Sequence, residues 1–211
     1  MLERNILIID DNLNVEKIYI PKYSKQIEKL KQAVPKWNDY MFCLKHCSSM
    51  KAALEYLSVP TNYVDVLVVD YDFNGETTFS DGTAFVEYVR KNINRYCQII
   101  FYSMQGMSSI DVNEWAKLVN SDVFRFVDKS AKDDLLAEAI FEAATKRNPI
   151  VESLERFWSK YSTMLESYSY TFDGRSVTFE EIINHIRMDD EIGRVFVERL
   201  LHKSILTNIE I

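Results

Sequence analysis

The chain has 211 residues and a formal net charge of −7, from 25 basic and 32 acidic residues. Hydrophobic residues make up 47% and charged residues 27%, as in ordinary globular proteins. General binders of nucleic acid or of anionic membranes are basic, so the acidic balance argues against both classes. The three cysteines, Cys43, Cys47 and Cys97, form no CxxC pair. A zinc site or a redox dithiol is therefore not expected, and a reducing compartment, the cytoplasm, is favoured.

Neither a membrane span nor a secretory signal is expected. The chain contains no run of about 18 or more apolar residues, the length that a membrane helix needs. The first apolar run, residues 6–9, meets Asp10 and Asp11 at once, which is too short for the apolar core of a signal peptide.

Five short apolar runs alternate with five segments of helical periodicity. The runs are rich in Val, Ile, Phe and Tyr, which is typical of strands buried on both faces of a parallel sheet. The predicted strands are 6–9, 41–44, 64–69, 99–102 and 123–127, and the predicted helices are 21–34, 50–57, 82–93, 112–119 and 135–144. This alternation predicts an α/β protein with a doubly wound, five-stranded parallel sheet and right-handed crossovers.

The pattern changes near Asn148-Pro149, so we expect a first domain over 1–147 and a second, mostly helical module over 148–211. In this module, Asp173-Gly174 is a hairpin turn signal. Thr178 with Glu181 forms a capping box that opens a helix. The other signals are an apolar helical stripe at Val151, Leu154, Trp158, Tyr161 and Leu165, and a last helix capped by Asp189 or Asp190.

Polar residues stand where the predicted strands end. Asp10 and Asp11 follow the first strand, Asp70 the third, Ser103 the fourth and Lys129 the fifth. Ligands of open parallel sheets bind at the carboxyl ends of the strands, where the strand order switches. In the order 2-1-3-4-5, the first and third strands flank that switch, so their carboxylates converge.

Three converging carboxylates repel one another and attract a divalent cation. Oxygen ligands that leave room for waters favour Mg²⁺. A carboxylate beside Mg²⁺ can attack a phosphoryl group to form an acyl phosphate. The ammonium of Lys129 and the hydroxyl of Ser103 are suited to the charge on the transferred group.

These residues resemble the receiver domain of two-component response regulators, the CheY-like family, over residues 4–147. Asp10 and Asp11 match the acid pair, Asp70 the phosphoacceptor, and Ser103 and Lys129 the later polar positions. Two further matches are Phe126, at the position of the switch aromatic, and Asp81-Gly82, at the start of the third helix. The resemblance implies a flavodoxin-like sheet of order 2-1-3-4-5.

The resemblance also implies a mechanism. A sensor histidine kinase would donate a phosphoryl group to Asp70, with Mg²⁺ held by Asp10, Asp11, Asp70 and the backbone carbonyl of Asp72. Ser103 and Phe126 would then act as the switch that changes protein–protein contacts. The chain would be a signalling protein and not an enzyme, apart from self-catalysed phosphotransfer and autodephosphorylation.

Two alternatives remain open. Ser130 stands where the family has Pro, and the loops after the first strand and after Asp70 are longer than usual, so a pseudo-receiver that signals without phosphorylation is one alternative. The other is a phosphatase of the haloacid-dehalogenase type, whose Asp-x-Asp motif Asp70 and Asp72 imitate. In that family, however, the nucleophile strand comes first.

The sequence says less about the partners of the chain than about its fold. Residues 148–211 carry 7 basic and 11 acidic residues, which does not favour DNA binding. We expect this module to bind an unknown protein target or to form a homodimer. Near the first helix, Lys22, Lys25, Lys29 and Lys36 form either a solvated face or a docking surface for the kinase.

Overall fold

The computed structural model describes residues 2–59, 62–71, 73, 78–104, 111–120, 123–129, 133–146 and 148–208. The chain divides into two compact units, one of residues 1–93 with 97–146 and one of residues 94–96 with 147–211. That the first unit is a receiver domain and the second an output module stays a prediction. Among the described helices, none combines the length and the apolar character that a membrane crossing needs.

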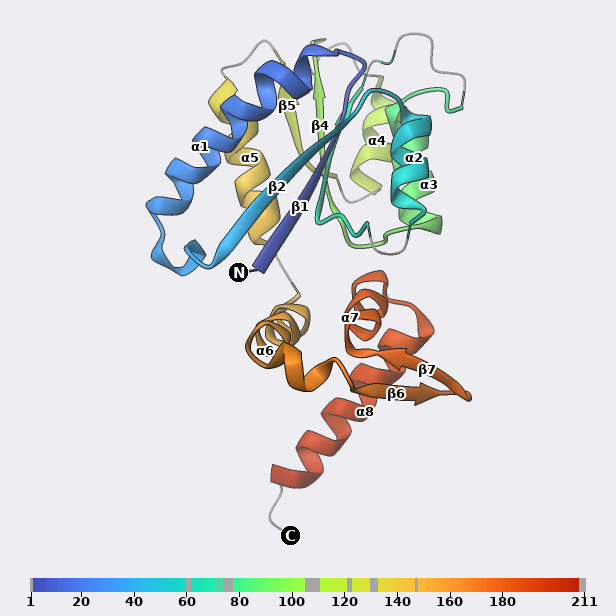
Figure 1. Ribbon diagram of the computed structural model, residues 1–211. Coiled ribbons are helices and arrows are strands. Elements are labelled where there is room, and N and C mark those ends of the chain that lie inside the picture. The colour runs from blue at the N-terminus through green and yellow to red at the C-terminus, as the bar shows by residue number, and fades with distance from the viewer. Residues whose placement is uncertain are drawn as a thin grey trace. The chain divides into compact units, whose positions relative to one another are not determined.

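The first unit is built on the five-stranded parallel sheet that the sequence predicts (Figure 1). Its strands lie in the order β2-β1-β3-β4-β5, so both the doubly wound fold class and the strand order are confirmed. The strands are β1 (Leu2–Ile9), β2 (Tyr40–Cys47), β3 (Val66–Asp70), β4 (Gln98–Ser103) and β5 (Val123–Asp128).

Helices cover both faces of this sheet (Figure 1). On one face lie α1 (Ile20–Gln32) and α5 (Asp133–Thr145), and on the other α2 (Met50–Leu57), α3 (Gly82–Asn92) and α4 (Val112–Asn120). Successive side chains of a strand point to opposite faces. In β4, therefore, Ile100 and Tyr102 pack with α1 and α5, whereas Ile99 and Phe101 pack with α2, α3 and α4.

The first helix differs from its prediction at both ends. A short π-helix, η1 (Val15–Tyr19), precedes α1, and α1 ends at Gln32, so the predicted extension to Val34 was wrong. Val34 is extended (φ −133°, ψ 94°) and precedes the 3₁₀ turn η2 (Pro35–Trp37). The ring of Pro35 disfavours the helical conformation in the residue before it, which ends the helix early.

The second unit has its own apolar core. It contains α6 (Pro149–Leu165), the hairpin β6 (Ser169–Phe172) and β7 (Arg175–Thr178), α7 (Phe179–Met188) and α8 (Glu191–Asn208). Val177 and Ile182 are completely buried in this core. The hairpin turns through Asp173 and Gly174, both with positive φ (44° and 78°), as the Asp-Gly signal predicts.

The helix caps of this unit also follow the sequence. The Thr178 hydroxyl accepts the backbone N–H of Glu181 (3.2 Å), and the Glu181 carboxylate accepts that of Thr178 (2.8 Å), so the capping box is complete. At the start of α8, the carboxylate of Asp190 accepts the backbone N–H of Gly193 at 3.0 Å. Of the two predicted caps for α8, Asp190 is therefore the one used.

The capping box predicts a pH dependence of stability. Its hydrogen bonds lower the pKa of the Glu181 carboxyl below the ordinary value of 4.5. A lowered pKa contributes stability above the unfolded-state value, and this contribution is lost as the pH falls through the folded-state value. Between about pH 6 and about pH 3, wild type should therefore lose more unfolding free energy than Glu181→Gln, which keeps an acceptor but does not titrate. Urea denaturation at a series of pH values measures this difference, and parallel pH profiles would contradict it.

Candidate functional site

Three carboxylates meet at the carboxyl edge of the sheet. Asp10 follows β1 and Asp70 ends β3, and these two neighbouring strands are in register from Ile6 with Val66 onward. The side chains of Asp10, Asp11 and Asp70 each bring an oxygen to within 4.8 Å of the others. Asp10 and Asp70 are only 2% and 3% exposed, so their charges are largely removed from water. Such a cluster is unfavourable unless positive groups compensate it.

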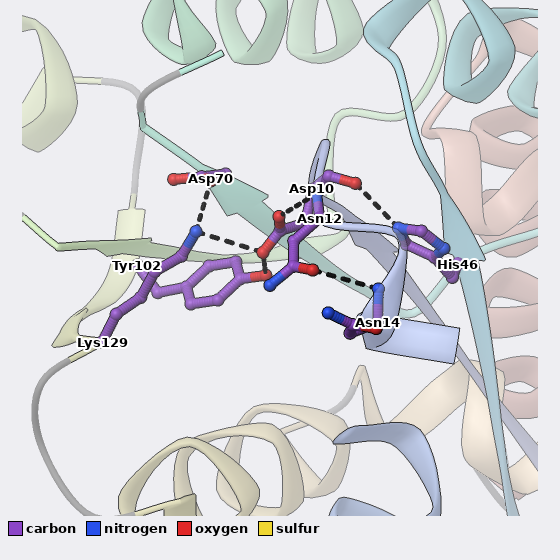
Figure 2. A network of polar contacts seen from close by, with 7 residues as sticks. All are labelled: Asp10, Asn12, Asn14, His46, Asp70, Tyr102 and Lys129. Atoms are coloured by element: carbon purple, nitrogen blue, oxygen red, sulfur yellow. Dashed lines mark hydrogen bonds and ion pairs between the residues drawn. The ribbon is translucent and has the colours of Figure 1, made fainter. Parts of the chain in front are cut away.

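Lys129 supplies the compensating charge. It follows β5, and its ammonium contacts the carboxylate of Asp70 and lies 3.1 Å from the Oδ2 of Asp10 (Figure 2). One ammonium among three carboxylates leaves the cluster with a formal charge of −2. The sequence-predicted grouping of Asp10, Asp11, Asp70 and Lys129 is therefore what the described residues show in space.

Tyr102 also belongs to the site, although in the sequence it stands within an apolar run and reads only as a strand residue. It is 5% exposed, its hydroxyl donates to the Oδ2 of Asp10, and its ring centroid lies 4.4 Å from the Lys129 ammonium (Figure 2). Burial, together with the charges of Asp10 and Asp70, raises the pKa of Tyr102 well above its usual range. The phenol therefore stays protonated and acts as a hydrogen-bond donor.

Further contacts fix Asp10 from its other side. The backbone N–H of Asn12 donates to the Oδ1 of Asp10 at 2.8 Å, and the side chain of Asn12 in turn accepts the backbone N–H of Asn14 at 3.0 Å (Figure 2). The Nε2 of His46, on β2, lies 2.7 Å from the backbone carbonyl of Asp10. A carbonyl only accepts, so this nitrogen carries the proton. Asp10 is thus held in one orientation by both its side chain and its backbone.

The backbone of Asp70 is confined by the start of α3. The Asp81 carboxylate caps this helix by accepting the backbone N–H of Ala84 at 2.9 Å. Gly82, the next residue, lies so close to β3 that an added Cβ would be 2.7 Å from the carbonyl oxygen of Asp70 and 3.0 Å from the ring of Phe101. Only glycine fits this approach, which explains the Asp-Gly pair.

The structure describes only some of the remaining residues that the sequence singles out. Ser103 ends β4 and is completely buried, and its carbonyl accepts the backbone N–H of Lys129 at 2.8 Å. Phe126 is half-buried and packs against the core on the α2, α3 and α4 side. Asp72, whose carbonyl is a predicted metal ligand, and Ser130, a predicted departure from the family, lie outside the described residues. The switch roles of Ser103 and Phe126 stay predictions.

The donor set of the cluster suits Mg²⁺. All three acidic groups offer carboxylate oxygens, and no sulfur or imidazole nitrogen joins them in the described group. Hard oxygen donors with space for waters are the ligands that Mg²⁺ prefers. The charge of −2 that remains beside Lys129 is the one that a divalent cation would neutralise.

Comparisons with known proteins found similar solved structures, while no family model and no curated protein matches the chain. The receiver domain of Francisella response regulator 1452 is 18% identical, with a TM-score of 0.42, over 67% of this chain and 96% of that one. A CheY-like receiver domain protein from Methanospirillum hungatei JF-1 is 14% identical, with a TM-score of 0.48, over 68% and 94%. RcsB from Salmonella enterica serovar Typhimurium, solved on a promoter with the phosphomimetic BeF₃⁻, is 17% identical, with a TM-score of 0.47, over 74% and 75%.

The Francisella and Methanospirillum structures are named as response regulator receiver domains, the family that the sequence resembles. The fold of the chain is established by its own strand order, and its function has to be argued from the residues of its site.

The contact between Gly82 and Asp70 generates a prediction on stability. Gly82→Ala should lower the free energy of unfolding by about 1–3 kcal/mol, because the added methyl group overpacks the space beside the Asp70 carbonyl and the Phe101 ring. Urea denaturation monitored by circular dichroism measures the change. The matched control is Gly174→Asn, since nothing lies within 4 Å of a Cβ there and Asn tolerates positive φ. Equal stability of Gly82→Ala and wild type would show that the approach is not as close as described.

Proposed function

We propose that this chain is a response regulator whose first unit accepts a phosphoryl group from a sensor histidine kinase on Asp70, with Mg²⁺ as cofactor. The observation that carries the proposal is the position of the Lys129 ammonium against the carboxylates of Asp70 and Asp10, with Asp11 in the same cluster. These groups come from the ends of three different strands. A structural ion pair needs one acid, whereas here one ammonium contacts two acids and a third acid lies in the same cluster.

In the proposed step, a carboxylate oxygen of Asp70 attacks the phosphorus of a phosphohistidine. The O–P bond forms as the P–N bond breaks, and the electron pair of that bond leaves with the imidazole of the kinase. Asp11, Asp70 and the Asp72 carbonyl would hold Mg²⁺, with Asp10 alongside. The bound ion would neutralise charge on the phosphoryl oxygens. Lys129, already beside Asp70, exchanges its carboxylate contact for a phosphoryl oxygen and so stays paired throughout.

The consequence of phosphorylation would reach β4 and β5. The backbone N–H of Lys129 is bonded to the carbonyl of Ser103, and Phe126 lies on β5, the strand that Lys129 follows. A new charge at Asp70 that draws on Lys129 and Ser103 would shift the population of two arrangements at these strand ends. The second unit, with its separate core, would be the module that binds a protein target or a second copy.

The location that fits this proposal is the cytoplasm. Cys43, Cys47 and Cys97 are all free thiols, and burial raises the pKa of each above its usual value. Free buried thiols are usual in reducing compartments.

The first test is phosphoryl uptake. Incubation with acetyl phosphate and Mg²⁺ should add one phosphoryl group to wild type and none to Asp70→Asn, because the amide cannot act as the nucleophile. Intact-mass spectrometry measures the gain. The matched control is Asp173→Asn, an exposed Asp-to-Asn change in the hairpin turn whose positive φ Asn adopts readily, and it should behave as wild type.

Other outcomes separate the alternatives. Uptake by Asp70→Asn equal to that of wild type would overturn Asp70 as the acceptor. Repeated turnover of phosphate monoesters would favour the phosphatase of the haloacid-dehalogenase type. No uptake from acetyl phosphate or from a kinase, and no binding of beryllofluoride, would favour the pseudo-receiver.

Metal binding gives a second, independent test. Asp11→Ala should weaken Mg²⁺ binding roughly tenfold or more, since even outer partners of metal ligands change affinity by about 10–100-fold. Isothermal titration calorimetry with magnesium chloride measures the affinity. The control is Asp39→Ala, which removes an exposed aspartate outside the cluster. Unchanged affinity in Asp11→Ala would contradict the predicted ligand set.

A further inference from the structure

Tyr102 has a role in the site that neither the sequence motif nor the proposed transfer step requires. The residue lies opposite Asp70 in the pairing of β3 with β4, and its side chain faces the core formed with α1 and α5. From this buried position its hydroxyl reaches only the carboxylate of Asp10 among the contacts of the described residues (Figure 2). The phenol is therefore a fixed donor aimed at one acid of the cluster.

The carboxylate of Asp10 is almost fully occupied by donors from the protein. A carboxylate offers about four lone-pair positions, two on each oxygen. The Oδ2 of Asp10 accepts from the Tyr102 hydroxyl and contacts the Lys129 ammonium, while Oδ1 accepts from the backbone N–H of Asn12. Asp10 is also nearly inaccessible to water, so each lost donor would leave a buried lone pair unsatisfied.

This occupation limits what Asp10 can do for a metal ion. A cation that bound the Oδ2 of Asp10 would have to displace the Tyr102 phenol or the Lys129 ammonium, and the three donors leave about one lone-pair position, on the buried Oδ1. In the ligand set proposed above, Asp11 and Asp70 coordinate the cation directly, and Asp10 contributes its charge while its own donors stay in place. A site with few direct protein ligands suits Mg²⁺, which binds six ligands and keeps several waters. It suits Ca²⁺ less, because Ca²⁺ takes 6–8 oxygen ligands and favours several carboxylates.

We propose that Tyr102 is a positioning residue that sets the cation preference of the site, by holding Asp10 out of direct coordination and so favouring Mg²⁺ over Ca²⁺. The inference rests on the proposed function of the site as a divalent-cation site. Tyr102 is better suited to this role than Lys129, the other donor to Oδ2. The ammonium is shared with Asp70 and sits on a flexible chain, whereas the phenol is anchored in the core of the sheet.

The test compares two cations in Tyr102→Phe. This variant keeps the ring, its packing and its face toward the Lys129 ammonium, and removes only the donor to Asp10. Isothermal titration calorimetry with calcium chloride or magnesium chloride alone, at constant ionic strength, gives the two dissociation constants. In the variant the affinity for Ca²⁺ relative to that for Mg²⁺ should rise roughly tenfold, since Asp10 becomes available as a further direct ligand.

Two controls separate this effect from a general disturbance. Tyr40→Phe removes a hydroxyl from another completely buried tyrosine, at the opposite end of the sheet beside Leu2, and should leave the ratio of affinities unchanged. In the background of Asp10→Asn, Tyr102→Phe should also have no effect on the ratio, because the phenol acts through that carboxylate. A merely structural role of Tyr102 would change both affinities together, whatever stands at position 10.

The outcomes are distinguishable. An unchanged ratio in Tyr102→Phe, with wild type binding Mg²⁺, would overturn the role of Tyr102 and leave the proposed function standing. An equal rise of the ratio in the Asp10→Asn background would also overturn it. Absence of binding of either cation to wild type would overturn the proposed metal site, and the role of Tyr102 with it.

Discussion

The repulsion among three carboxylates in a site almost closed to water is the constraint on which this edge of the sheet depends. Two like charges about 4 Å apart repel each other by about 4 kcal/mol at an effective dielectric constant of about 20. The chain offsets this cost with an ammonium from Lys129, a phenol from Tyr102 and a backbone N–H from Asn12. These donors come from three separate segments, so the site forms only when the strands have assembled. The cluster is therefore a property of the tertiary fold and not of any local motif.

Most of the fold and much of this cluster could be predicted from the sequence, because strand ends are visible as apolar runs that stop at polar residues. Asp10, Asp70 and Lys129 each stand at such a stop. Tyr102 was missed because it is counted as part of the apolar run of β4. A signal was nevertheless available, since strand residues alternate between faces. Asp70 continues the face of Val66 and Val68, which is also the face of Tyr102, so alternation places the phenol beside the acids.

Short motifs that form their own hydrogen bonds or turns predicted the structure more reliably than the apolar period of a helix did. The capping box at Thr178 and the Asp-Gly turn of the hairpin involve residues at most three positions apart, and both form as expected. The predicted helix through Val34 failed because the apolar period was followed without regard to Pro35, which restricts the residue before it. The π-helix η1 could not be predicted, since what shapes this segment is tertiary packing, with Val15 buried in the core beneath it. The extra residues after β1 thus form a helical turn and not an open loop.

The same contacts that hold the site together also decide which of its parts can respond to a change in charge. The backbone at Asp70 is confined by Gly82, and Asp10 is held by donors on both of its oxygens. The ammonium of Lys129 is the group that can move most easily, because it sits at the end of a flexible side chain and contacts two acids at once. In the proposed function, a phosphoryl group on Asp70 would redistribute that one charge. The backbone N–H of Lys129 is bonded to Ser103, so the disturbance would pass to the ends of β4 and β5 and leave Asp10 and β1 in place.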